Sequence, residues 1–586
     1  MAIKSRLLFY DFEVFKYDWM VVIIDYSSRQ EKVIINDVEE LKRIYLKFKD
    51  SIWVGYNSRF YDSVILKSLL LGMNPKEVND KLIVDGLKGH QISNKFNNIK
   101  LYNYDTIILN TSLKQLEGFM GENIKETSVD FNLDRKLTQT EIEETIKYCR
   151  HDVEQTIKVF EATKSDFDAH VGMINVFNLS MSDFNKTKAK LSAKALGAER
   201  LHGLNDEFDY YIPDCIKLDK YKYVLDWFLD DENRCYTKVN EKGKNVKNQL
   251  KTDVMGVEHI FGFGGVHGAI KKYKGEGLFI MSDISSMYPA TMINFNLLSR
   301  AVKNPEKYRQ IRDDRLEMKK NKDARQYPMK ILLNSTYGIL KDQHSDFYDP
   351  RQANSVCIVG QVAILDLLEK LEYKFGDKIE LIQSNTDGIL VKLTEESLYE
   401  EYLNTCKEWE LRTGYELEHD EYVKVFQKDV NNYVIVDKNG KFKSKGAYVK
   451  KLSKIDYNLA IVNKALVEYF INDTPIEETI NNCDNLIDFQ NISKIGSTYS
   501  HIMYGDKKLN EKVIRTFAAT KDLPGVFKIK YVEKDGEMIE RVEKIANTPE
   551  RCFINNDDIN DVRCPEYLDK EYYIEMAKKR LKDFVK

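Results

Sequence analysis

An aspartate stands at the end of a short apolar run near the middle of the chain, where residues 278–281 precede Ser282 and Asp283. A run of this length predicts a strand that ends close to Asp283. Further along, residues 381–384 and 389–391 flank a polar segment that contains Asp387. Two apolar runs around a short turn predict a β-hairpin with Asp387 at its tip. Distant strands can meet in one sheet, so we expect the two carboxylates to converge.

Between these two aspartates lies a segment whose polar and aromatic residues recur at helical spacing. Lys330, Asn334 and Tyr337 stand at positions i, i+4 and i+7, so one helix face presents a cation, an amide and an aromatic ring. Two carboxylates can hold a pair of divalent cations, and a cation beside them can bind phosphate. The set is typical of phosphoryl transfer.

Size and charge limit the class of protein. With 586 residues and 43% hydrophobic content, the chain can bury several cores, and about 150 residues per domain suggests about three to five domains. The net charge of −4 gives no global signal for a polyanionic partner. A nucleic-acid site must therefore be local. Residues 301–330 and 437–454 are two basic patches, for each of which a solvated face is the alternative.

Cysteine usage and hydropathy indicate the compartment. The eight cysteines form no C-x-x-C pair and have no histidine at zinc-ligand spacing, so we expect reduced thiols in a cytoplasmic protein. The apolar part of the N-terminus is too short for a signal peptide, and no run approaches the roughly 18 apolar residues of a membrane span. We expect no membrane association.

The N-terminal part carries three short polar patterns. An apolar strand over residues 7–10 ends in Asp11-Phe12-Glu13, and the period of two puts Asp11 and Glu13 on one side. A buried strand at 52–57 leads into a helix, so that Asn57 and Asp62 lie close together around the turn. Taken alone, these patterns are ordinary surface charge and helix capping.

The third pattern lies on a helix that we predict over residues 140–160. Its apolar stripe is formed by Ile142, Ile146, Cys149, Val153, Ile157 and Phe160. Tyr148 and Asp152 stand four residues apart beside this stripe. Taken alone, this pair is a surface hydrogen bond.

Together, D-x-E, N-x-x-x-Y-D and Y-x-x-x-D resemble the three motifs of proofreading 3′–5′ exonucleases of the DnaQ-like class. The resemblance implies an RNase H-like domain over residues 1–170 that acts on the 3′ end of single-stranded DNA. Two Mg²⁺ or Mn²⁺ ions would be held by Asp11, Glu13, Asp62 and Asp152. Tyr148 would orient the attacking water, while Asn57 and Tyr61 would hold the DNA, the tyrosine by stacking on a base.

The segment from Asp283 to Pro289, with Ser286, Met287 and Tyr288 between them, resembles motif A of family B DNA polymerases, D-x-x-S-[LM]-Y-P. The resemblance implies that Tyr288 packs under the sugar of an incoming dNTP and excludes a 2′-hydroxyl.

The segment from Lys330 to Gly338 matches the K-x-x-x-N-S-x-Y-G motif B of the same family. Lys330 would contact the triphosphate, together with Arg315 and Lys319 of a helix predicted over 308–319. Tyr337 would lie under the nascent base pair, and Asn334 completes the nucleotide-binding set.

Residues 385–388 resemble motif C, usually D-T-D-S, but Asn385 and Gly388 replace its first and last residues. Asp387 keeps the position of the principal metal ligand, so the resemblance implies two Mg²⁺ or Mn²⁺ ions at Asp283 and Asp387. Asn385 removes a negative charge, which can alter metal affinity or choice.

Two further elements match less closely. Lys428 and Tyr433 stand in place of a K-x-Y element that grips the primer strand, and they lead into a lysine-rich hairpin predicted over 434–451. Gly264 and Gly265 match part of a Y-x-G-G element that touches the template. Its aromatics are displaced to Phe261 and Phe263.

The resemblance implies an α/β and α+β multidomain fold, with an RNase H-like exonuclease domain and a right-hand polymerase. The expected parts are a connecting region and first palm segment at 171–300, fingers at 301–340, a second palm segment at 341–450 and a thumb at 451–586. Within the thumb we predict a helix over 459–471 and a helical C-terminus. Catalytic roles would fall to Asp283, Asp387 and Lys330, and to Asp11, Glu13, Asp62, Tyr148 and Asp152.

The resemblance as a whole is to a family B DNA polymerase of phage type. Protein-primed phage members carry large insertions between motifs A and B and between B and C, whereas these intervals are only about forty and fifty residues here. We therefore expect extension of a nucleic-acid primer, with no terminal protein. We expect a monomer that binds primer-template DNA and dNTPs. Candidate protein partners are a replisome helicase, a primase and a single-strand-binding protein. Two alternatives stay open. One is a repair exonuclease whose second half only binds DNA. The other is a catalytically silent replication scaffold, which only Asn385 supports.

Overall fold

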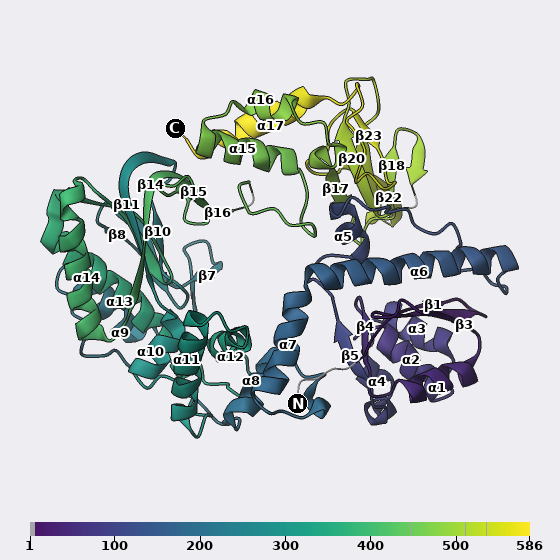
Figure 1. The fold of residues 1–586 in the computed structure, drawn as a ribbon, viewed down its shortest axis with the longest axis horizontal. Coiled ribbons are helices and arrows are strands. Elements are labelled where there is room, and N and C mark those ends of the chain that lie inside the picture. Colours follow the sequence, from purple (N-terminus) through teal and green to yellow (C-terminus); the bar gives the residue numbers. More distant parts are fainter. Residues whose placement is uncertain (1–5, 447, 510, 535, 586) are drawn as a thin grey trace.

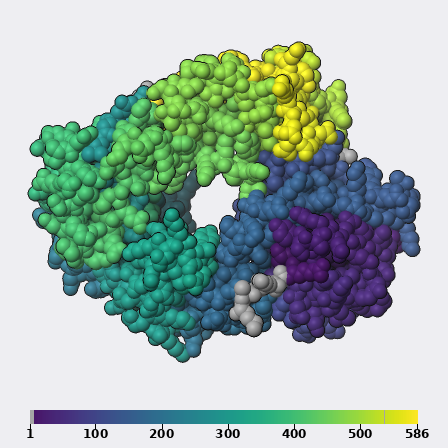
Figure 2. Space-filling view, in the orientation of Figure 1, coloured from purple at the N-terminus to yellow at the C-terminus, as the bar shows by residue number. Residues whose placement is uncertain are grey.

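The computed structural model describes residues 6–446, 448–509, 511–534 and 536–585. The chain forms several packed α/β units arranged around an opening through the middle of the molecule (Figures 1 and 2). Within the described ranges, no helix combines the length and apolar character that a membrane crossing requires.

The N-terminal region is a five-stranded mixed sheet covered by helices on both faces (Figure 1). Strand order is β3-β2-β1-β4-β5, with β1 antiparallel to β2 and parallel to β4. The strands are β1 (Leu7–Val14), β2 (Trp19–Asp25), β3 (Glu31–Ile35), β4 (Ile52–Gly55) and β5 (Tyr102–Asp105). The helices are α1 (Val38–Lys47), α2 (Asp62–Leu70), α3 (Pro75–Ile83), α4 (Gly89–Ile92), α5 (Leu113–Phe119) and α6 (Gln139–Ala162).

Alternation along β1 decides which face each side chain takes. Leu8, Tyr10 and Phe12 pack in the cluster formed with α1, α2 and α3. Phe9 packs instead in the cluster that contains the α6 stripe. By the period of two, Asp11 and Glu13 share the face of Phe9 and lie towards α6. The strand predicted to run from Leu7 into Asp11-Phe12-Glu13 is confirmed, and its pairing with β2 continues to Val14. The helix predicted over 140–160 is confirmed as α6.

A nine-stranded antiparallel sheet forms the second large unit, in the order β16-β15-β14-β11-β13-β12-β10-β9-β8. The strands are β8 (Gln249–Val254), β9 (Val257–Gly262), β10 (His267–Ala269), β11 (Tyr273–Ile284), β12 (Ile379–Asn385), β13 (Gly388–Leu393), β14 (Leu417–Asp429), β15 (Asn432–Val436) and β16 (Phe442–Lys445). The strand predicted before Asp283 and the hairpin predicted around Asp387 are confirmed.

One face of this sheet is covered by α10 (Met287–Asn294), α13 (Pro350–Phe375) and α14 (Tyr399–Thr413). Ile280 and Ile284 of β11 pack in this core, while Phe279 and Met281 belong to a smaller cluster on the opposite face. Asp283 lies an even number of positions from Phe279 and Met281 along the strand, so it shares their face. Its carboxylate therefore lies on the face opposite to α13.

Helices connect these two sheets. α7 (Lys164–Val176), α8 (Lys188–Leu196) and α9 (Lys222–Leu229) follow the N-terminal region, before the short ribbon of β6 (Thr237–Val239) and β7 (Asn245–Lys247). The antiparallel pair α11 (Pro305–Lys320) and α12 (Gln326–Gly338) packs against α7, α8 and α10 (Figure 1). The helix predicted over 308–319 is confirmed, and α12 puts Lys330, Asn334 and Tyr337 on one face.

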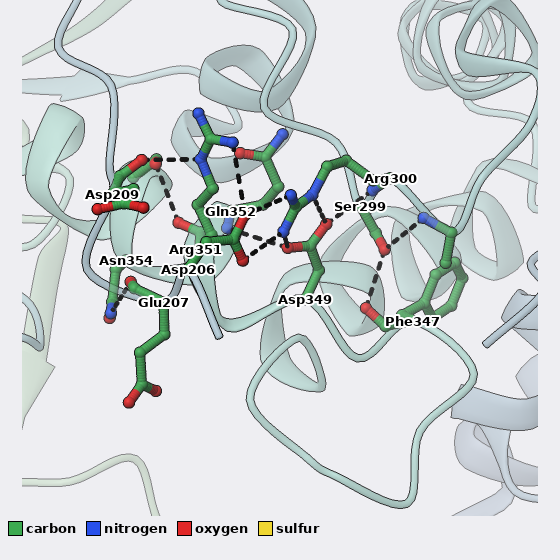
Figure 3. Close-up of polar contacts among 12 residues, drawn as sticks. Asp206, Glu207, Asp209, Ser299, Arg300, Phe347, Asp349, Arg351, Gln352 and Asn354 are labelled. Atoms are coloured by element: carbon green, nitrogen blue, oxygen red, sulfur yellow. Dashed lines mark hydrogen bonds and ion pairs between the residues drawn. The ribbon is translucent and has the colours of Figure 1, made fainter. Parts of the chain in front are cut away.

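An ion-pair network fixes the irregular segment around Asp206 to the sheet unit (Figure 3). The Arg300 guanidinium donates to Asp206 at 2.6 Å and to Asp349 at 2.7 Å. Asp349 also caps α13 by accepting from the Gln352 backbone N–H. The segment around Asp206 therefore has a structural role.

The C-terminal region combines a helix layer with two small sheets. The helices are α15 (Ala460–Asn472), α16 (Ile476–Asn481) and α17 (Lys570–Leu581), which confirms the predicted helix at 459–471 and the helical C-terminus. One sheet has the order β17-β20-β23 and the other β19-β18-β21-β22. The strands are β17 (Asn491–Lys494), β18 (His501–Tyr504), β19 (Lys507–Leu509), β20 (Val513–Ala518), β21 (Val526–Lys534), β22 (Glu537–Lys544) and β23 (Cys552–Ile554).

The lysine-rich hairpin is shorter than predicted. β15 and β16 pair as far as Lys445, so the hairpin predicted to 451 is too long at its C-terminal end; residue 447 lies outside the described residues. Gly446 follows with a φ of +111°, where its backbone lies close to Asn432. A backbone in this conformation leaves the strand path, which ends the pairing.

Candidate active sites

The tip of the β12–β13 hairpin lies beside the end of β11. Asn385 pairs with Gly388 across the turn, and Gly388 pairs with Asp283 of β11. The Ile284 backbone N–H donates to the Asp387 carbonyl at 2.7 Å, which fixes the turn to the neighbouring strand. The structure thus brings Asp283 and Asp387 together at adjacent strand ends.

Gly388 permits this close approach. A Cβ at this position would lie 2.0 Å from Asp283 Oδ1 and 2.9 Å from the Ser282 carbonyl oxygen. Any other residue would therefore displace the Asp283 carboxylate or separate β13 from β11. Glycine at position 388 thus has a steric cause in this chain.

If this site performs the phosphoryl transfer predicted from the sequence, we expect Gly388→Ala to reduce its rate strongly while the protein stays folded. A displacement of about 1 Å at a reacting centre can cost about a hundredfold in rate. Gly496→Ala is the matched control, since the nearest heavy atom to its added Cβ is 4.0 Å away. Steady-state rates of this reaction and melting temperatures of both variants check this. Full activity of folded Gly388→Ala would contradict a role for the Asp283 carboxylate in the reaction.

The electrostatics of Asp283 reflect a cluster of carboxylates. Burial raises the pKa of this carboxyl to about 6, against the opposing effect of Lys443 and with the help of Asp387, Asp420 and Glu418. Lys443 Nζ lies 4.0 Å from Asp283 Oδ2. An excess of negative charge with oxygen donors fits the ligand preference of Mg²⁺ and Mn²⁺.

A cavity of about 470 Å³ opens over these carboxylates. Its lining comes from the end of β11 and the start of α10, from α11, α12 and β14, and from the hairpin tip, and includes Asp283, Ser286, Met287, Tyr288, Pro289, Arg315, Lys319, Lys330, Asn334, Tyr337, Asp387 and Glu418. Three cations thus face two strand-end carboxylates. Such a cavity matches a polyanionic ligand that is bound through cations.

Arg315 is the most buried cation of the cavity. Its Nη1 donates to Ser286 Oγ at 2.8 Å, and its Nε has no hydrogen-bond partner among the described residues. Burial lowers the pKa of this guanidinium. Lys319, one helix turn further on, lies 3.4 Å from Glu418 Oε1. Arg315 therefore presents N–H donors with no carboxylate acceptor, as an anion-binding residue does.

Two tyrosines form one wall of the cavity. The rings of Tyr288 and Tyr337 are stacked, with centroids 3.7 Å apart and an interplanar angle of 14°. Tyr288 lies in the first turn of α10, which Ser286 begins in the left-handed conformation at φ 52°. The stack joins α10 to α12 and presents an aromatic surface beside the carboxylates.

The glycine-rich turn between β9 and β10 lies against the hairpin tip. A Cβ on Gly265 would lie 2.3 Å from Thr386 Oγ1, whereas Gly264 has open space around it. Lys428 and Tyr433 do not line the cavity. Lys428 instead pairs with Asp583 at 3.4 Å, and Tyr433 is buried in the small cluster of the sheet.

Sequence patterns missed Glu418 and Lys443 at this site. Glu418 of β14 stands opposite Asp283 in the sheet register. No motif marks this glutamate, and only the pairing of β14 with β11 brings it to the cavity. Lys443 lies within the basic patch at 437–454, so that patch was the only signal available for it.

A second carboxylate cluster lies between β1, α2 and α6. It contains Asp11 and Glu13 of β1, Asp62 at the start of α2, and Asp152 of α6. The Phe12 backbone N–H donates to Asp62 Oδ1 at 3.0 Å. Cys149 Sγ lies 3.6 Å from Asp11 Oδ2. The structure therefore brings all four predicted carboxylates together.

Burial raises the pKa of every member of this cluster, and nearby carboxylates add to the effect. The pKa of Asp62 rises to about 7 and that of Asp152 to about 6, with burial as the largest cause. Asp11 and Glu13 are raised as well, first by burial and then by neighbouring carboxylates. Four buried carboxylates with oxygen donors fit a pair of divalent cations, which would relieve the repulsion.

Lys114 of α5 is a cation that sequence patterns missed. Its Nζ lies 3.0 Å from Asp152 Oδ1 and 3.1 Å from Glu117 Oε2. It also lies 4.7 Å from the centroid of the Tyr148 ring. The Tyr148 hydroxyl donates to Glu126 Oε2 at 3.1 Å. Residues 113–126 carry no catalytic pattern, so only the packing of α5 on α6 shows their part in the cluster.

The remaining predicted residues flank Asp62. Asn57 is exposed and has a φ of 58°, at the turn after β4. The Tyr61 hydroxyl donates to Asn79 Oδ1 at 2.8 Å, and its ring packs beside the cluster of α2 and α3. Tyr61 is thus held partly in the core in this structure.

The raised pKa values predict a pH-dependent stability. An unfolded carboxyl loses its proton near pH 4, whereas Asp152 and Asp62 keep theirs until about pH 6 and 7. The folded state therefore binds more protons in this window, so the contribution of the cluster to stability falls as the pH rises through it. In EDTA, Asp62→Asn should weaken this fall.

Adding Mn²⁺ or Mg²⁺ should raise the melting temperature more at pH 7.5 than at pH 5.5, because the ligands must be deprotonated. Thermal melts of wild type and Asp62→Asn, with and without metal, measure both effects. Equal metal stabilisation at the two pH values would contradict this account of the cluster.

Comparisons with known proteins give a limited result. No protein-family model matches the sequence, and no curated protein matches it. Among solved structures, the family B DNA polymerase from the hyperthermophilic archaeon Pyrobaculum calidifontis aligns with a TM-score of 0.43 and 15% identity. The alignment covers 99% of this chain and 78% of that one.

Proposed function

We propose that this chain is a family B DNA polymerase of phage type, which extends a nucleic-acid primer on a DNA template and removes nucleotides from 3′ ends at a second site. One observation carries the proposal. Asp283 and Asp387 face three cations and a stacked tyrosine pair in a single cavity. The complete motif B on α12 supports the same reading.

In the proposed synthesis reaction, the primer 3′-hydroxyl attacks the α-phosphate of a dNTP. A new bond forms between the 3′-oxygen and the α-phosphorus. The bond between the α-phosphorus and the oxygen that bridges to the β-phosphate breaks, and pyrophosphate leaves. Divalent cations held by Asp283 and Asp387 would supply acidity to the hydroxyl and charge stabilisation to the leaving group. Asn385 adds an amide oxygen beside this pair but no charge.

The cations of the cavity have the charge that a triphosphate requires. Arg315 and Lys319 approach from α11, and Lys330 approaches from α12. Arg315 has a free Nε among the described residues, so it can donate to phosphate without breaking an ion pair. Lys319 would exchange its contact with Glu418 for one with phosphate.

The stacked tyrosines would select the sugar. Tyr288 would lie under the deoxyribose, where a 2′-hydroxyl would meet its ring, while Tyr337 would support the base pair. We expect Tyr288→Ala to raise ribonucleotide incorporation relative to dNTP incorporation by roughly 10- to 200-fold, the range that one steric contact provides. Tyr288→Phe keeps the ring and is the control. Competition assays with rNTPs check this, and unchanged selectivity of Tyr288→Ala would contradict it.

The second site would hydrolyse the terminal phosphodiester of single-stranded DNA. Asp11, Glu13, Asp62 and Asp152 would hold two divalent cations, which supply hydroxide at neutral pH and charge stabilisation. Tyr148 would orient the attacking water, and Lys114 offsets part of the negative charge at Asp152. Asn57 and Tyr61 would hold the 3′ end, for which Tyr61 must leave its contact with Asn79.

The proposed domains can be found in Figure 1 by the residue numbers of its colour bar. An RNase H-like domain covers residues 1–170, palm segments cover 171–300 and 341–450, fingers cover 301–340, and a thumb covers 451–586. Primer-template DNA would bind in the central opening of Figure 2. Gly264, Gly265, Lys428 and Tyr433 remain proposed DNA contacts. Helicase, primase and single-strand-binding protein are proposed partners of a monomer in the cytoplasm.

Extension of a preformed primer-template tests this function. With Mg²⁺ and dNTPs, we expect the wild-type chain to lengthen a 5′-labelled DNA primer without any protein primer. Extension only from a protein-linked primer would refute the proposed mode of priming. Degradation without extension would favour the alternative of a nuclease whose second half only binds DNA.

A further inference from the structure

A fully buried arginine, Arg515, connects the C-terminal region to a segment near residue 120. Arg515 lies in β20, and each of its five side-chain N–H groups donates to a neutral oxygen. Nε donates to Gln490 Oε1 at 3.0 Å, and Nη1 to the carbonyls of Asn555 at 3.2 Å and Asp557 at 2.6 Å. Nη2 donates to the carbonyls of Gly118 at 3.3 Å and Glu122 at 2.7 Å.

Further hydrogen bonds fix the same stretch, which we call segment 118–124, to the C-terminal region. Gln490 Nε2 donates to the Phe119 carbonyl at 3.1 Å. The backbone N–H of Ile124 donates to the Asn556 carbonyl at 2.9 Å, and that of Ile559 donates to the Gly121 carbonyl at 2.8 Å. Figure 1 shows α5 beside β17 and β20, which it contacts. The C-terminal region thus satisfies much of the backbone of this segment.

Segment 118–124 is flanked on both sides by charged residues that lie next to the N-terminal carboxylate cluster. Lys114 and Glu117 come before it on α5, and Glu126 comes after it. Lys114 pairs with Asp152, and Glu126 accepts from Tyr148. The segment therefore determines where three charged side chains stand relative to Asp152 and Tyr148.

We infer that Arg515 is a positioning residue for the exonuclease site, and that the C-terminal region completes this site by holding segment 118–124. The inference rests on the proposed exonuclease function for its kinetic consequence, but its structural consequence can be measured separately. Residues 1–170 alone would then lack part of what orders their own active site.

The test uses full-length Arg515→Met, which keeps the side-chain bulk but removes all five donors. Hydrogen exchange of residues 114–126 should become faster, because the Gly118 and Glu122 carbonyls lose their donors and the segment is held less firmly. Turnover of a single-stranded oligonucleotide should fall by about a hundredfold, the effect of a misplacement of about 1 Å. Its KM should change much less, and primer extension should be unaffected.

Arg300→Met is the matched control, since Arg300 also joins distant segments through several hydrogen bonds (Figure 3) but lies outside this interface. Gly121→Ala is a second variant that leaves Arg515 intact. Gly121 has a φ of +76°, which strains any residue with a Cβ, and a Cβ there would lie 2.6 Å from Ile487 Cδ1, so the substitution disturbs the contact between the segment and the C-terminal region. We expect it to reproduce the kinetic and exchange changes of Arg515→Met.

The possible outcomes distinguish failure of the positioning role of Arg515 from failure of the proposed exonuclease function. Unchanged exchange at 114–126 in folded Arg515→Met and Gly121→Ala would overturn the inference. Normal exonuclease turnover in both variants would also overturn it. A wild-type chain without nuclease activity would refute the proposed exonuclease, and the exchange experiment would still decide whether Arg515 orders the segment.

Discussion

Asp387→Asn should abolish primer extension and leave degradation of 3′ ends intact. The carboxylate is exposed at the tip of the β12–β13 hairpin, and it is the backbone carbonyl of Asp387 that bonds to Ile284. The substitution therefore removes charge without removing a structural contact. Loss of metal-assisted charge stabilisation is worth several kcal/mol, and about 4 kcal/mol corresponds to about a thousandfold in rate.

Asp377→Asn is the matched control for this variant. Asp377 is also an exposed aspartate, but it lies at the opposite end of β12, in the short helix before Ile379. We expect it to extend primers like the wild type. Single-turnover extension at saturating dNTP, with melting curves for all three proteins, makes the comparison. Extension by Asp387→Asn within tenfold of the wild type would contradict its assignment as a metal ligand.

Asp11→Ala should have the opposite effect, with loss of degradation and retention of extension. We expect the exonuclease rate to fall by at least about a thousandfold, on the same reasoning about charge stabilisation. Stability without metal should stay equal or rise at neutral pH, because burial and the neighbouring Asp62 and Glu13 raise the pKa of Asp11 and disfavour its charge.

Asp25, in the same sheet, provides a control because its pKa is shifted in the opposite direction to that of Asp11. Asp25 is buried, yet hydrogen bonds from Arg6 and Ser28 outweigh the burial and lower its pKa. Asp25→Ala should therefore lower stability at neutral pH, while the folded protein keeps its exonuclease activity. Melting curves and degradation of a labelled single strand measure both variants. A stabilised Asp25→Ala or an active Asp11→Ala would be contrary to these assignments.

Much of the polymerase cavity was predictable from sequence because its signals are local. The apolar run before Asp283 and the two-residue turn at Asp387 both specify strand ends, and the helix face with Lys330 follows from spacing alone. Glu418 was not predictable. It reaches the cavity only through the pairing of β14 with β11, and such register is a long-range property, because a shift of one residue would turn this side chain to the other face.

In the N-terminal cluster, too, the residues marked by local patterns were predictable and those placed by long-range contacts were not. The helical stripe predicted α6 and therefore the place of Tyr148 and Asp152. Lys114, Glu117 and Glu126 lie in a stretch without periodic pattern, and their position depends on contacts with Arg515 and Gln490 in the C-terminal region. No local rule connects residues so far apart in sequence. The alternation along β1 likewise predicted that Asp11 and Glu13 share a face, because the period of two is a local property of a strand.

The measurement that tests the central claim most directly is single-nucleotide incorporation by the wild-type chain. A 5′-labelled primer is annealed to four templates that differ only in the next base, and each is given one dNTP at a time with Mg²⁺. The account predicts that each primer gains one nucleotide only with the dNTP complementary to its template base. Shortening of the primer in every mixture, or addition independent of the template base, would contradict a template-directed polymerase.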